Sequence, residues 1–236
     1  SRKTVKKYCE GSSEVDVFIT RSDWVFYFLL KNKKKVVFEC HQLSKIRRFV
    51  MKKSIKSENS KIIFLNNYLK NDSGIDSQKF EDKLIVLHNG VDSNLFKHNI
   101  VKDKNGIIFI GNLKRFGENR NLEFYISTFK NENMPKDFKF TIIGTPKAEV
   151  NRLNKYVKEL GLEKNVEVKN WINREEVIEA LNKSSIGLLI NTKSNEHSVK
   201  YTSPLKYFEY IYGNLKVVAT NYPAHNELPF SNKICF

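Results

Sequence analysis

The sequence lacks long hydrophobic runs and has few cysteines. Its three cysteines, Cys9, Cys40 and Cys235, lie far apart and form no Cys-x-x-Cys pair and no Cys/His cluster. This spacing argues against a disulfide scaffold and a structural zinc site, and a reducing compartment is the simplest interpretation. The longest apolar run, Trp24–Leu30, is far shorter than the ~20 residues of a spanning helix. The basic N-terminal residues precede no hydrophobic segment of the signal-peptide type. We therefore expect a cytoplasmic protein.

Apolar residues are sufficient for a packed core, and basic residues are in excess. Hydrophobic residues make up 40% of the 236 positions, which excludes disorder as the main state. The formal net charge is +15, which favours acidic partners: nucleic acid, an anionic membrane surface or phosphorylated ligands. A Lys/Asn/Ile-rich composition that reflects genome bias explains the same charge equally well.

Short β-branched and aromatic runs alternate with helical patterns. Continuous apolar runs are typical of strands buried on both faces of a parallel sheet. Helices are predicted at Lys147–Leu160, Arg174–Lys183 and Pro204–Tyr212. The alternation predicts an α/β fold with right-handed crossovers. The strands are expected at Asp16–Thr20, Lys35–Glu39, Lys61–Leu65, Leu84–Leu87, Gly106–Gly111, Phe138–Gly144, Asn165–Lys169, Ile186–Ile190 and Lys216–Thr220.

A polar stretch, Asp92–Asn105, follows the turn-forming pair Asn89-Gly90 and separates two sets of strands. We predict one domain over residues 1–98 and a second over residues 99–236. The first holds only about four strands and is expected to be incomplete. The last residues, Lys233–Phe236, are expected to begin a further strand.

The most informative segment runs from Tyr201 to Gly213. Ser203 is a favourable N-cap, and Pro204 at the first helical position loses no hydrogen bond there. A helix that begins after a strand directs free N–H groups toward the carboxyl edge of the sheet, where they attract a phosphate. Glu209, further along the helix, is placed to accept two hydrogen bonds from a ribose diol. An ordinary capped helix with a surface glutamate has the same pattern.

Several motifs together resemble the GT-B glycosyltransferases, especially glycosyltransferase family 4. The segment Ser203-Pro204-Leu205-Lys206 with Glu209-Tyr210 resembles the nucleotide-sugar motif of that family. His88-Asn89-Gly90-Val91-Asp92 through Phe96 resembles the interdomain signature. The other matches, in chain order, are Ile107–Gly111, Arg120-Asn121-Leu122, Phe140–Gly144, Val166–Asn173, Val217–Thr220 and Tyr222-Pro223.

The resemblance implies two Rossmann-like parallel-sheet domains that face a cleft, and a nucleotide-sugar site. The phosphates are expected at the first-turn amides and at Arg120, and the ribose at Glu209. The loop Trp171-Ile172 is expected to read the base, and His41 to approach the transferred sugar. His41 and Arg120 are thus the catalytic candidates. The donor-binding candidates are Gly111, Asn112, Arg120, Trp171, Ile172, Ser203, Pro204, Leu205, Lys206 and Glu209.

Each assignment has an alternative. Arg120 is also interpretable as a solvated charge at a helix start, Trp171 as a core aromatic, and His41 as a partner of a loop carbonyl. Three positions depart from the family pattern. His88 replaces a proline and is expected to have no chemical role. Asn112 replaces a basic residue, for which Lys114 or Arg115 can substitute, and Tyr201 replaces an acid.

The family implies transfer with retention of anomeric configuration. The paired carboxylates of glycosidases are not apparent, so we expect attack on the same face, with the leaving phosphate taking the acceptor proton. Glu14-Val-Asp16 opens a predicted strand and is interpreted as structural, and we expect no cofactor and no obligatory metal. The expected acceptor is a glycan or lipid-linked glycan of cell-envelope polysaccharide or lipopolysaccharide synthesis.

The basic residues of the first domain suggest a contact with the inner face of the membrane. They are Lys31–Lys35, Arg47-Arg48 and Lys52-Lys53. A solvated helix face explains them as well. Two other functions remain open: a nucleotide-sugar-binding module or inactive remnant that needs a partner chain, and a nucleic-acid-binding protein. The last lacks any interleaved basic and aromatic motif, and we expect no nucleic-acid partner.

Overall fold

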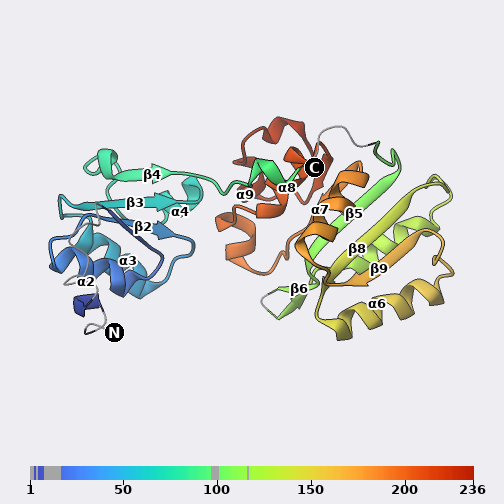
Figure 1. Ribbon diagram of the computed structural model, residues 1–236, viewed down its shortest axis with the longest axis horizontal. Helices are drawn as coiled ribbons and strands as arrows, with labels where there is room; N and C mark the ends of the chain where they lie inside the picture. Colours follow the sequence, from blue (N-terminus) through green and yellow to red (C-terminus); the bar gives the residue numbers. More distant parts are fainter. Residues whose placement is uncertain (1–2, 4, 8–16, 97–100, 116) are drawn as a thin grey trace. The chain divides into compact units, whose positions relative to one another are not determined.

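The computed structural model describes residues 3, 5–7, 17–96, 101–115 and 117–236. The chain divides into two compact units, each described here by itself (Figure 1). The first unit comprises Ser1–Asn89 and Val199–Ser203, and the second comprises Gly90–Ser198 and Pro204–Phe236. The boundary predicted at residue 98 lies in 97–100, outside the described residues, as does the whole of Glu14-Val-Asp16.

The first unit is built on a four-stranded parallel sheet in the order β1-β2-β3-β4. The aromatic side chains of Phe26, Phe38 and Phe64 are fully buried in its core with Met51. Its strands are β1 (Phe18–Thr20), β2 (Val36–Cys40), β3 (Ser60–Phe64) and β4 (Leu84–Val86). Its helices are α2 (Asp23–Lys31), α3 (Lys45–Ser54), α4 (Asn67–Asn71) and the 3-10 turn η1 (Glu81–Lys83).

Polar side chains set where these helices begin. Ser44 Oγ accepts a hydrogen bond from Arg47 N at 3.1 Å, and Asn66 Oδ1 accepts one from Leu69 N at 2.9 Å. Ser22 caps α2 in the same way. An N-cap oxygen satisfies one of the amides that a helix start leaves without an intrahelical partner.

The short segment 199–203 belongs to the first unit although it lies far along the chain. The buried amide of Asn66 donates from Nδ2 to Lys200 O at 2.9 Å. The Tyr201 hydroxyl donates to Asp72 Oδ2 at 2.6 Å, and the Tyr201 ring packs in the hydrophobic core of the first unit. Tyr201, where the family has an acid, therefore serves packing within this unit.

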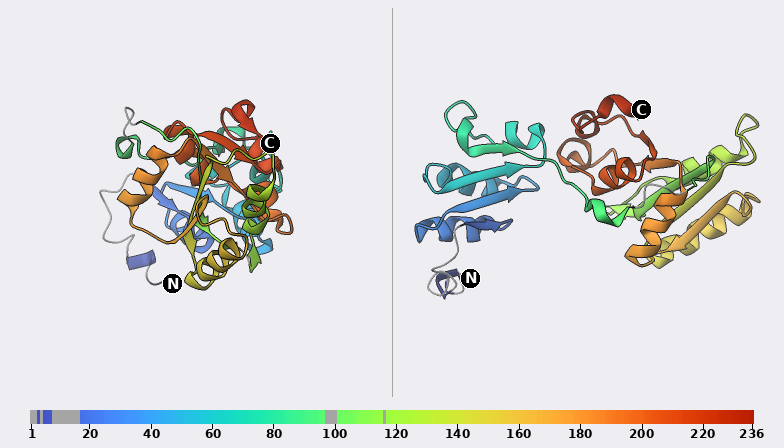
Figure 2. Two further views of the ribbon diagram at one scale, coloured as in Figure 1. Left: turned by 90° about the vertical axis from the view of Figure 1, so that its right-hand side faces the viewer. Right: turned by 45° about the horizontal axis from the view of Figure 1, so that its top comes forward.

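The second unit contains a six-stranded, all-parallel sheet in the order β12-β11-β10-β5-β8-β9. Its strands β5, β8 and β9 lie side by side in Figure 1, and Figure 2 shows the unit from two further directions. Neighbouring residues of one strand serve opposite faces: Ile108 packs in one core cluster and Phe109 in the other. Its strands are β5 (Gly106–Asn112), β8 (Lys139–Thr145), β9 (Val166–Asn170), β10 (Ile186–Leu189), β11 (Lys216–Ala219) and β12 (Ile234–Cys235), with the two-stranded ribbon β6 (Lys114–Arg115) and β7 (Glu118–Asn119).

Helices cover both faces of this sheet. Residues of α5 and α6 share a core cluster with Phe109, whereas residues of α7 and α8 share the cluster of Ile108. The helices are α5 (Leu122–Ser127), α6 (Lys147–Glu159), α7 (Arg174–Lys183), α8 (Leu205–Tyr212) and α9 (Pro223–Asn226). Short turns complete the unit: η2 (Ser93–Leu95), η3 (Thr128–Lys130) and η5 (Ser231–Lys233). The π-helical η4 (His197–Tyr201) begins in the second unit and ends in the first.

The prediction of an α/β fold with parallel sheets is confirmed, and a strand lies at each of the nine predicted positions. The expected strand at the C-terminal end is β12. Helix α7 has the predicted bounds, and a capping box between Asn173 and Glu176 explains its start. One helix start differs: α8 begins at Leu205, not at Pro204.

The strand order positions a binding crevice. From β5 the chain moves to β8 and β9 on one side, and then returns to β10, β11 and β12 on the other. The order therefore reverses between β5 and β10. In open parallel sheets the loops beyond the carboxyl ends of strands at such a switch point leave a crevice that binds ligands.

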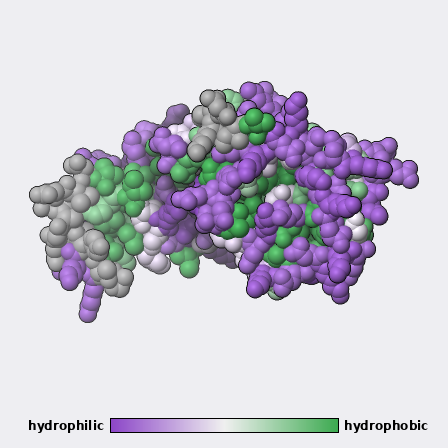
Figure 3. Space-filling model, turned by 45° about the vertical axis from the view of Figure 1, so that its right-hand side comes forward, coloured by the Kyte–Doolittle hydropathy of each residue, from purple (hydrophilic) through white to green (hydrophobic). Residues whose placement is uncertain are grey.

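Hydrophilic side chains predominate on the face drawn in Figure 3, which agrees with the 28% of charged residues. No helix in the described part of the chain is long and apolar enough to cross a bilayer.

Candidate functional site

A hollow of about 650 Å³ lies at the switch point of the second unit. Its lining residues follow the carboxyl ends of β10 and β11, or belong to the segment from β7 to α5, which includes residues of both elements. They include Arg120, Ile190, Asn191, Thr220 and Tyr222. The predicted Arg120 therefore lines a hollow at the place where the topology favours ligand binding.

Arg120 is held as a charged group without a carboxylate partner among the described residues. Its Nη1 donates to the carbonyl oxygen of Ile190, and its Cζ lies 5.6 Å from the ring centroid of Phe109. Burial, together with the nearby charge of Arg115, lowers the pKa of Arg120 to about 10. The guanidinium thus keeps its charge at neutral pH, and the interpretation as a solvated surface charge is wrong.

Arg115 contacts a residue that lines the hollow, whereas Lys114 pairs with a carboxylate. Lys114 Nζ lies 2.6 Å from Glu149 Oε1, which neutralises it. Arg115 Nη1 donates to Asn191 Oδ1 at 3.2 Å, and burial lowers the pKa of Arg115. Two guanidiniums near one hollow are suited to the oxygens of a diphosphate.

A directional hydrogen-bond chain orients Arg115. His225 Nδ1 lies 2.7 Å from Thr220 O, and because a carbonyl only accepts, Nδ1 carries the proton. His225 Nε2 therefore accepts from Asn191 Nδ2 at 3.3 Å, which leaves Asn191 Oδ1 to accept from Arg115. His225 is fully buried, and this burial lowers its pKa, which favours the neutral ring that the chain requires.

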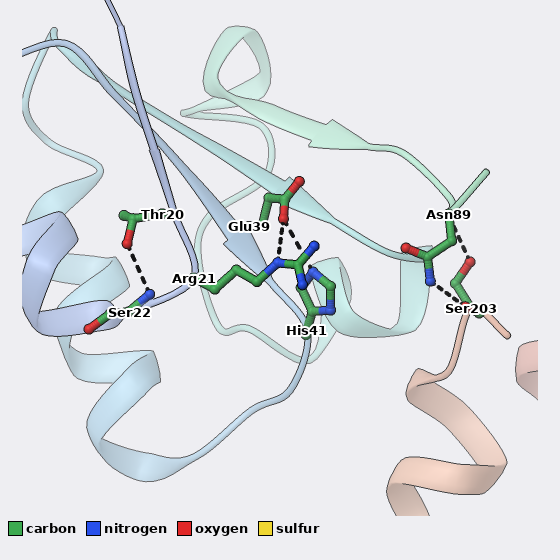
Figure 4. A network of polar contacts seen from close by, with 7 residues as sticks. All are labelled: Thr20, Arg21, Ser22, Glu39, His41, Asn89 and Ser203. Carbon is green, nitrogen blue, oxygen red and sulfur yellow. Dashed lines mark hydrogen bonds and ion pairs between the residues drawn. The ribbon is translucent and has the colours of Figure 1, made fainter. Parts of the chain in front are cut away.

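The start of α8 differs from the predicted cap. Pro204, with an extended backbone (ψ 121°), is the N-cap and makes no side-chain capping bond. The Ser203 hydroxyl instead accepts from Asn89 N at 3.0 Å, and the Ser203 carbonyl accepts from Asn89 Nδ2 within the first unit (Figure 4). The prediction that Ser203 caps the helix is therefore wrong, because Asn89 takes its hydroxyl. The amides of Leu205 and Lys206 belong to the first turn, which has no intrahelical acceptors for them.

The carboxylate of Glu209 is buried between two cations. Its side chain is 6% exposed, with Oε1 2.5 Å from Arg174 Nη1 and Oε2 2.8 Å from Lys206 Nζ. A carboxylate has about four lone-pair positions, so these bonds leave acceptor capacity. The alternative of a surface glutamate is wrong. Arg174, the first residue of α7, was not predicted as a site residue. The local sequence indicates a helix start at Asn173 but gives no signal for a contact between Arg174 and Glu209.

Trp171 and Ile172 follow β9 and have different surroundings. Trp171 is 52% exposed, and Lys206 Nζ lies 5.9 Å from its ring centroid. Ile172 packs against the core cluster of α7 and α8. The interpretation of Trp171 as a core aromatic is therefore wrong. Its exposed ring, the Lys206 ammonium and Glu209 form a connected group.

Gly111 and Asn112 end β5, next to Gly144 and Thr145 of β8. A Cβ at Gly144 would lie 2.4 Å from Gly111 O, so the two strands meet here with no room for a side chain. Asn112 pairs in the sheet one residue beyond the predicted strand end. Both residues border the switch point through their position at the carboxyl end of β5.

The remaining catalytic candidate, His41, directly follows β2 in the first unit. Its Nε2 lies 3.4 Å from Glu39 Oε2, which also accepts from Arg21 Nε at 2.7 Å (Figure 4). Burial and the Arg21 charge lower the pKa of His41, which makes the neutral ring the form at neutral pH. Its partner is thus a carboxylate rather than the loop carbonyl considered from the sequence.

Solved structures similar to this chain share its fold. HepE from Anabaena, in complex with UDP and glucose, matches with a TM-score of 0.63 at 14% identity, over 96% of this chain and 65% of that one. A glycosyltransferase from Rickettsia africae has a TM-score of 0.64 at 19% identity, over 96% and 62%. The pneumococcal O-GlcNAc transferase GtfA, in complex with UDP and GlcNAc, has a TM-score of 0.61 at 12% identity, over 94% and 44%.

The chain thus spans between 44% and 65% of the lengths of these three structures. These likenesses show the fold, which is the GT-B fold that the motifs predicted. None of the curated proteins matches the sequence. The family model described as glycosyl transferases group 1 matches residues 91–229, which include nearly all of the second unit. Because this match covers more than half of the chain, the protein belongs to the group 1 glycosyl transferases.

Proposed function

We propose that the chain transfers a sugar from a nucleoside diphosphate sugar to a glycan or lipid-linked acceptor with retention of configuration, as in glycosyltransferase family 4. The pathway we propose is the synthesis of cell-envelope polysaccharide or lipopolysaccharide. The carrying observation is the buried Glu209 carboxylate, which lies on the same helix as the first-turn amides of Leu205 and Lys206. A carboxylate suits a ribose diol, and helix-start amides suit a phosphate.

The donor binds, in this proposal, along the carboxyl edge of the second sheet. Glu209 accepts the ribose hydroxyls, and the half-exposed ring of Trp171 lies beside the base, which the loop backbone through Ile172 reads. Arg120 and Arg115 bind the diphosphate, with the ends of β5 at Gly111 and Asn112 close to the transferred sugar. UDP-sugars are the first donors to test, since HepE and GtfA were solved with UDP.

Departure of the nucleoside diphosphate is the step that the protein assists. The bond between the anomeric carbon and the phosphate oxygen breaks, and the acceptor oxygen bonds to that carbon on the same face. The acceptor proton passes to the leaving phosphate. Negative charge grows on the diphosphate during this step, and fixed guanidiniums stabilise it at low reorganisation cost. His41, neutral near pH 7, contributes a hydrogen bond to the sugar rather than a positive charge.

We propose that this chemistry uses no resident metal ion, because Arg115 and Arg120 supply the positive charge that a divalent cation supplies elsewhere. The proposed location is the cytoplasm. Cys40 and Cys235 are free thiols, which suits a reducing compartment, and burial raises the pKa of Cys40 to about 11.

The test combines donor binding with turnover. Calorimetry with UDP-, GDP- and ADP-glucose measures affinity, and release of the nucleoside diphosphate, with and without glycan acceptors, measures transfer. Saturable binding of one donor with acceptor-dependent release supports the proposal, and NMR of the product establishes the anomer. Binding without turnover across acceptors supports the binding module instead. Absence of binding to every nucleotide sugar would overturn both.

A further inference from the structure

Two neighbouring helices of the first unit expose apolar side chains to solvent. On α2, Trp24 is 50% exposed; on α3, Ile46 is 58% and Phe49 is 63% exposed. These residues lie on the outer stripes of their helices, whereas Phe26 and Met51 on the opposite sides are buried. A soluble surface without a partner seldom gathers three large apolar groups on adjacent helices.

Contacts join these side chains into one surface. The Trp24 ring lies 6.4 Å from the Tyr27 ring. Lys53 Nζ lies 5.5 Å from the Tyr27 centroid and 5.9 Å from the Phe49 centroid, which bridges α2 to α3. Lys31 Nζ approaches the same Tyr27 ring at 5.7 Å. We call the surface of Trp24, Tyr27, Lys31, Ile46, Phe49 and Lys53 the aromatic–basic face.

The stretch of sequence that carries this face has mostly positive charges. Between Arg21 and Lys56 the sequence has eleven lysines and arginines but two carboxylates, Asp23 and Glu39. Both carboxylates pair with arginines: Asp23 Oδ2 lies 3.7 Å from Arg47 Nε, and Glu39 Oε2 lies 2.7 Å from Arg21 Nε. Since the carboxylates are paired, the lysines give this stretch its net positive charge, and Lys31 and Lys53 lie beside the exposed rings.

We propose that the aromatic–basic face docks on an anionic phospholipid bilayer. Aromatic rings with polar edges prefer the headgroup region, and a lysine stem lies along apolar surface while its ammonium reaches lipid phosphates. Apolar insertion and attraction to anionic lipid add in such surface helices. This inference goes beyond the proposed transfer reaction and does not depend on it.

The residues of the proposed membrane contact differ from those expected from charge alone. Arg47 does not take part, because its Nη1 donates to Gln42 O at 3.1 Å and its guanidinium covers the Phe38 ring. The apolar residues Trp24, Ile46 and Phe49 replace it as the inserting groups. RNA fits this face less well: Trp24 stacks on Phe28, and Ile46 offers a base no stacking surface and no hydrogen bond.

The first experiment locates the contact. The chain has two tryptophans, so Trp171→Phe leaves Trp24 as the single indole reporter. Vesicles of phosphatidylcholine mixed with phosphatidylglycerol, with or without bromine on the acyl chains, are added to this variant. A blue shift of the emission, quenching by bromine and release by salt are expected. Vesicle binding without a shift or quenching of Trp24 would mean a different surface and overturn the proposal.

The second experiment uses matched variants in vesicle co-sedimentation. Lys31→Gln/Lys53→Gln is expected to weaken binding to the anionic vesicles about 30-fold, at about fivefold per lysine near the surface. Phe49→Ser is expected to weaken it about tenfold through lost apolar insertion. The controls in the second unit are Lys155→Gln/Lys158→Gln on α6 and Phe230→Ser, whose native side chains are also exposed.

Four outcomes would overturn the proposal. One is equal binding by the face variants and their controls. Another is vesicle binding that does not depend on phosphatidylglycerol. A third is tight RNA binding with no vesicle binding. The fourth is a concentration-dependent dimer in analytical ultracentrifugation that Phe49→Ser abolishes, which would assign the face to a second copy of the chain. Circular dichroism melting checks that each variant is folded.

Discussion

Arg174, the first residue of α7, and Glu209, in the second turn of α8, meet in an ion pair with Nη1 2.5 Å from Oε1. The carboxylate is buried, whereas the Arg174 side chain is 46% exposed. Lys206 binds the second carboxylate oxygen at 2.8 Å. Glu209 is therefore fixed in place before any ligand arrives, and this preorganisation is what a ribose-binding carboxylate needs.

Replacing Glu209 tests the ribose contact. Glu209→Ala is expected to weaken affinity for the donor by about 10- to 100-fold, because hydrogen bonds to a charged group are lost. Calorimetry with the donor measures the change, and Glu159→Ala on the exposed side of α6 is the control. Unchanged affinity in a folded Glu209→Ala variant would refute the assignment.

Arg174 is predicted to act through Glu209 and not on the reacting atoms. Arg174→Ala should raise KM for the donor about tenfold, in line with the loss of a charge-assisted hydrogen bond, while kcat changes little. Arg152→Ala is the control: Arg152 lies on α6 and also pairs with carboxylates, those of Glu123 and Glu149, but not with Glu209. A fall in kcat with KM unchanged would assign Arg174 a different role.

Arg120 is predicted to recognise the diphosphate. Arg120→Gln should lower affinity for UDP by at least about tenfold but leave affinity for uridine nearly unchanged, because only the former carries the charge. The ratio of the two affinities separates this effect from general damage to the hollow, which would lower both. Equal losses for the two ligands would contradict the prediction.

His225 makes the stability of the second unit depend on pH. Burial holds its pKa in the folded state below the ordinary value of 6.5, so the unfolded chain binds more protons as the pH falls through that region. The contribution of His225 to the free energy of unfolding is expected to be complete above about pH 7. It decreases as the pH falls toward the pKa of His225 in the folded state. His41, whose pKa is also lowered, gives the stability of the first unit a pH dependence of the same sign.

Denaturant titrations at several pH values measure this dependence. His225→Gln is expected to flatten the slope between about pH 7 and pH 5, since it removes a group that gains a proton on unfolding. His41→Gln provides the comparison for the other depressed histidine. A His225→Gln variant with the slope of the natural protein would show that this ring does not carry the effect.

Chelation tests the proposal that arginines, not a metal, neutralise the diphosphate. EDTA is expected to leave donor affinity and transfer rate unchanged within about twofold, because the fixed guanidiniums remain. Loss of activity that Mg²⁺ or Mn²⁺ restores would contradict the prediction.

Local sequence was enough for the order of elements. Most of the predicted strands are runs of apolar residues between turn formers, and this pattern acts within a few residues of chain. The start of α7 follows from Asn173 and Glu176 in the same way. Glu209 was found because its spacing from Pro204 matches a known motif, not because its burial was visible in the sequence.

Only the tertiary structure decided which polar groups meet. The Ser203 hydroxyl accepts a hydrogen bond from Asn89, 114 positions away in the sequence, and makes no capping bond to α8. Lys114 is neutralised by Glu149, whereas Arg115 is oriented by Asn191 and His225, and no local pattern distinguishes the two cations. The hydrophobic periodicity of a helix or strand can be read from the sequence, because the face that the element buries depends on the spacing of its own residues. The partner and charge of a polar side chain depend on which distant residues the fold brings beside it.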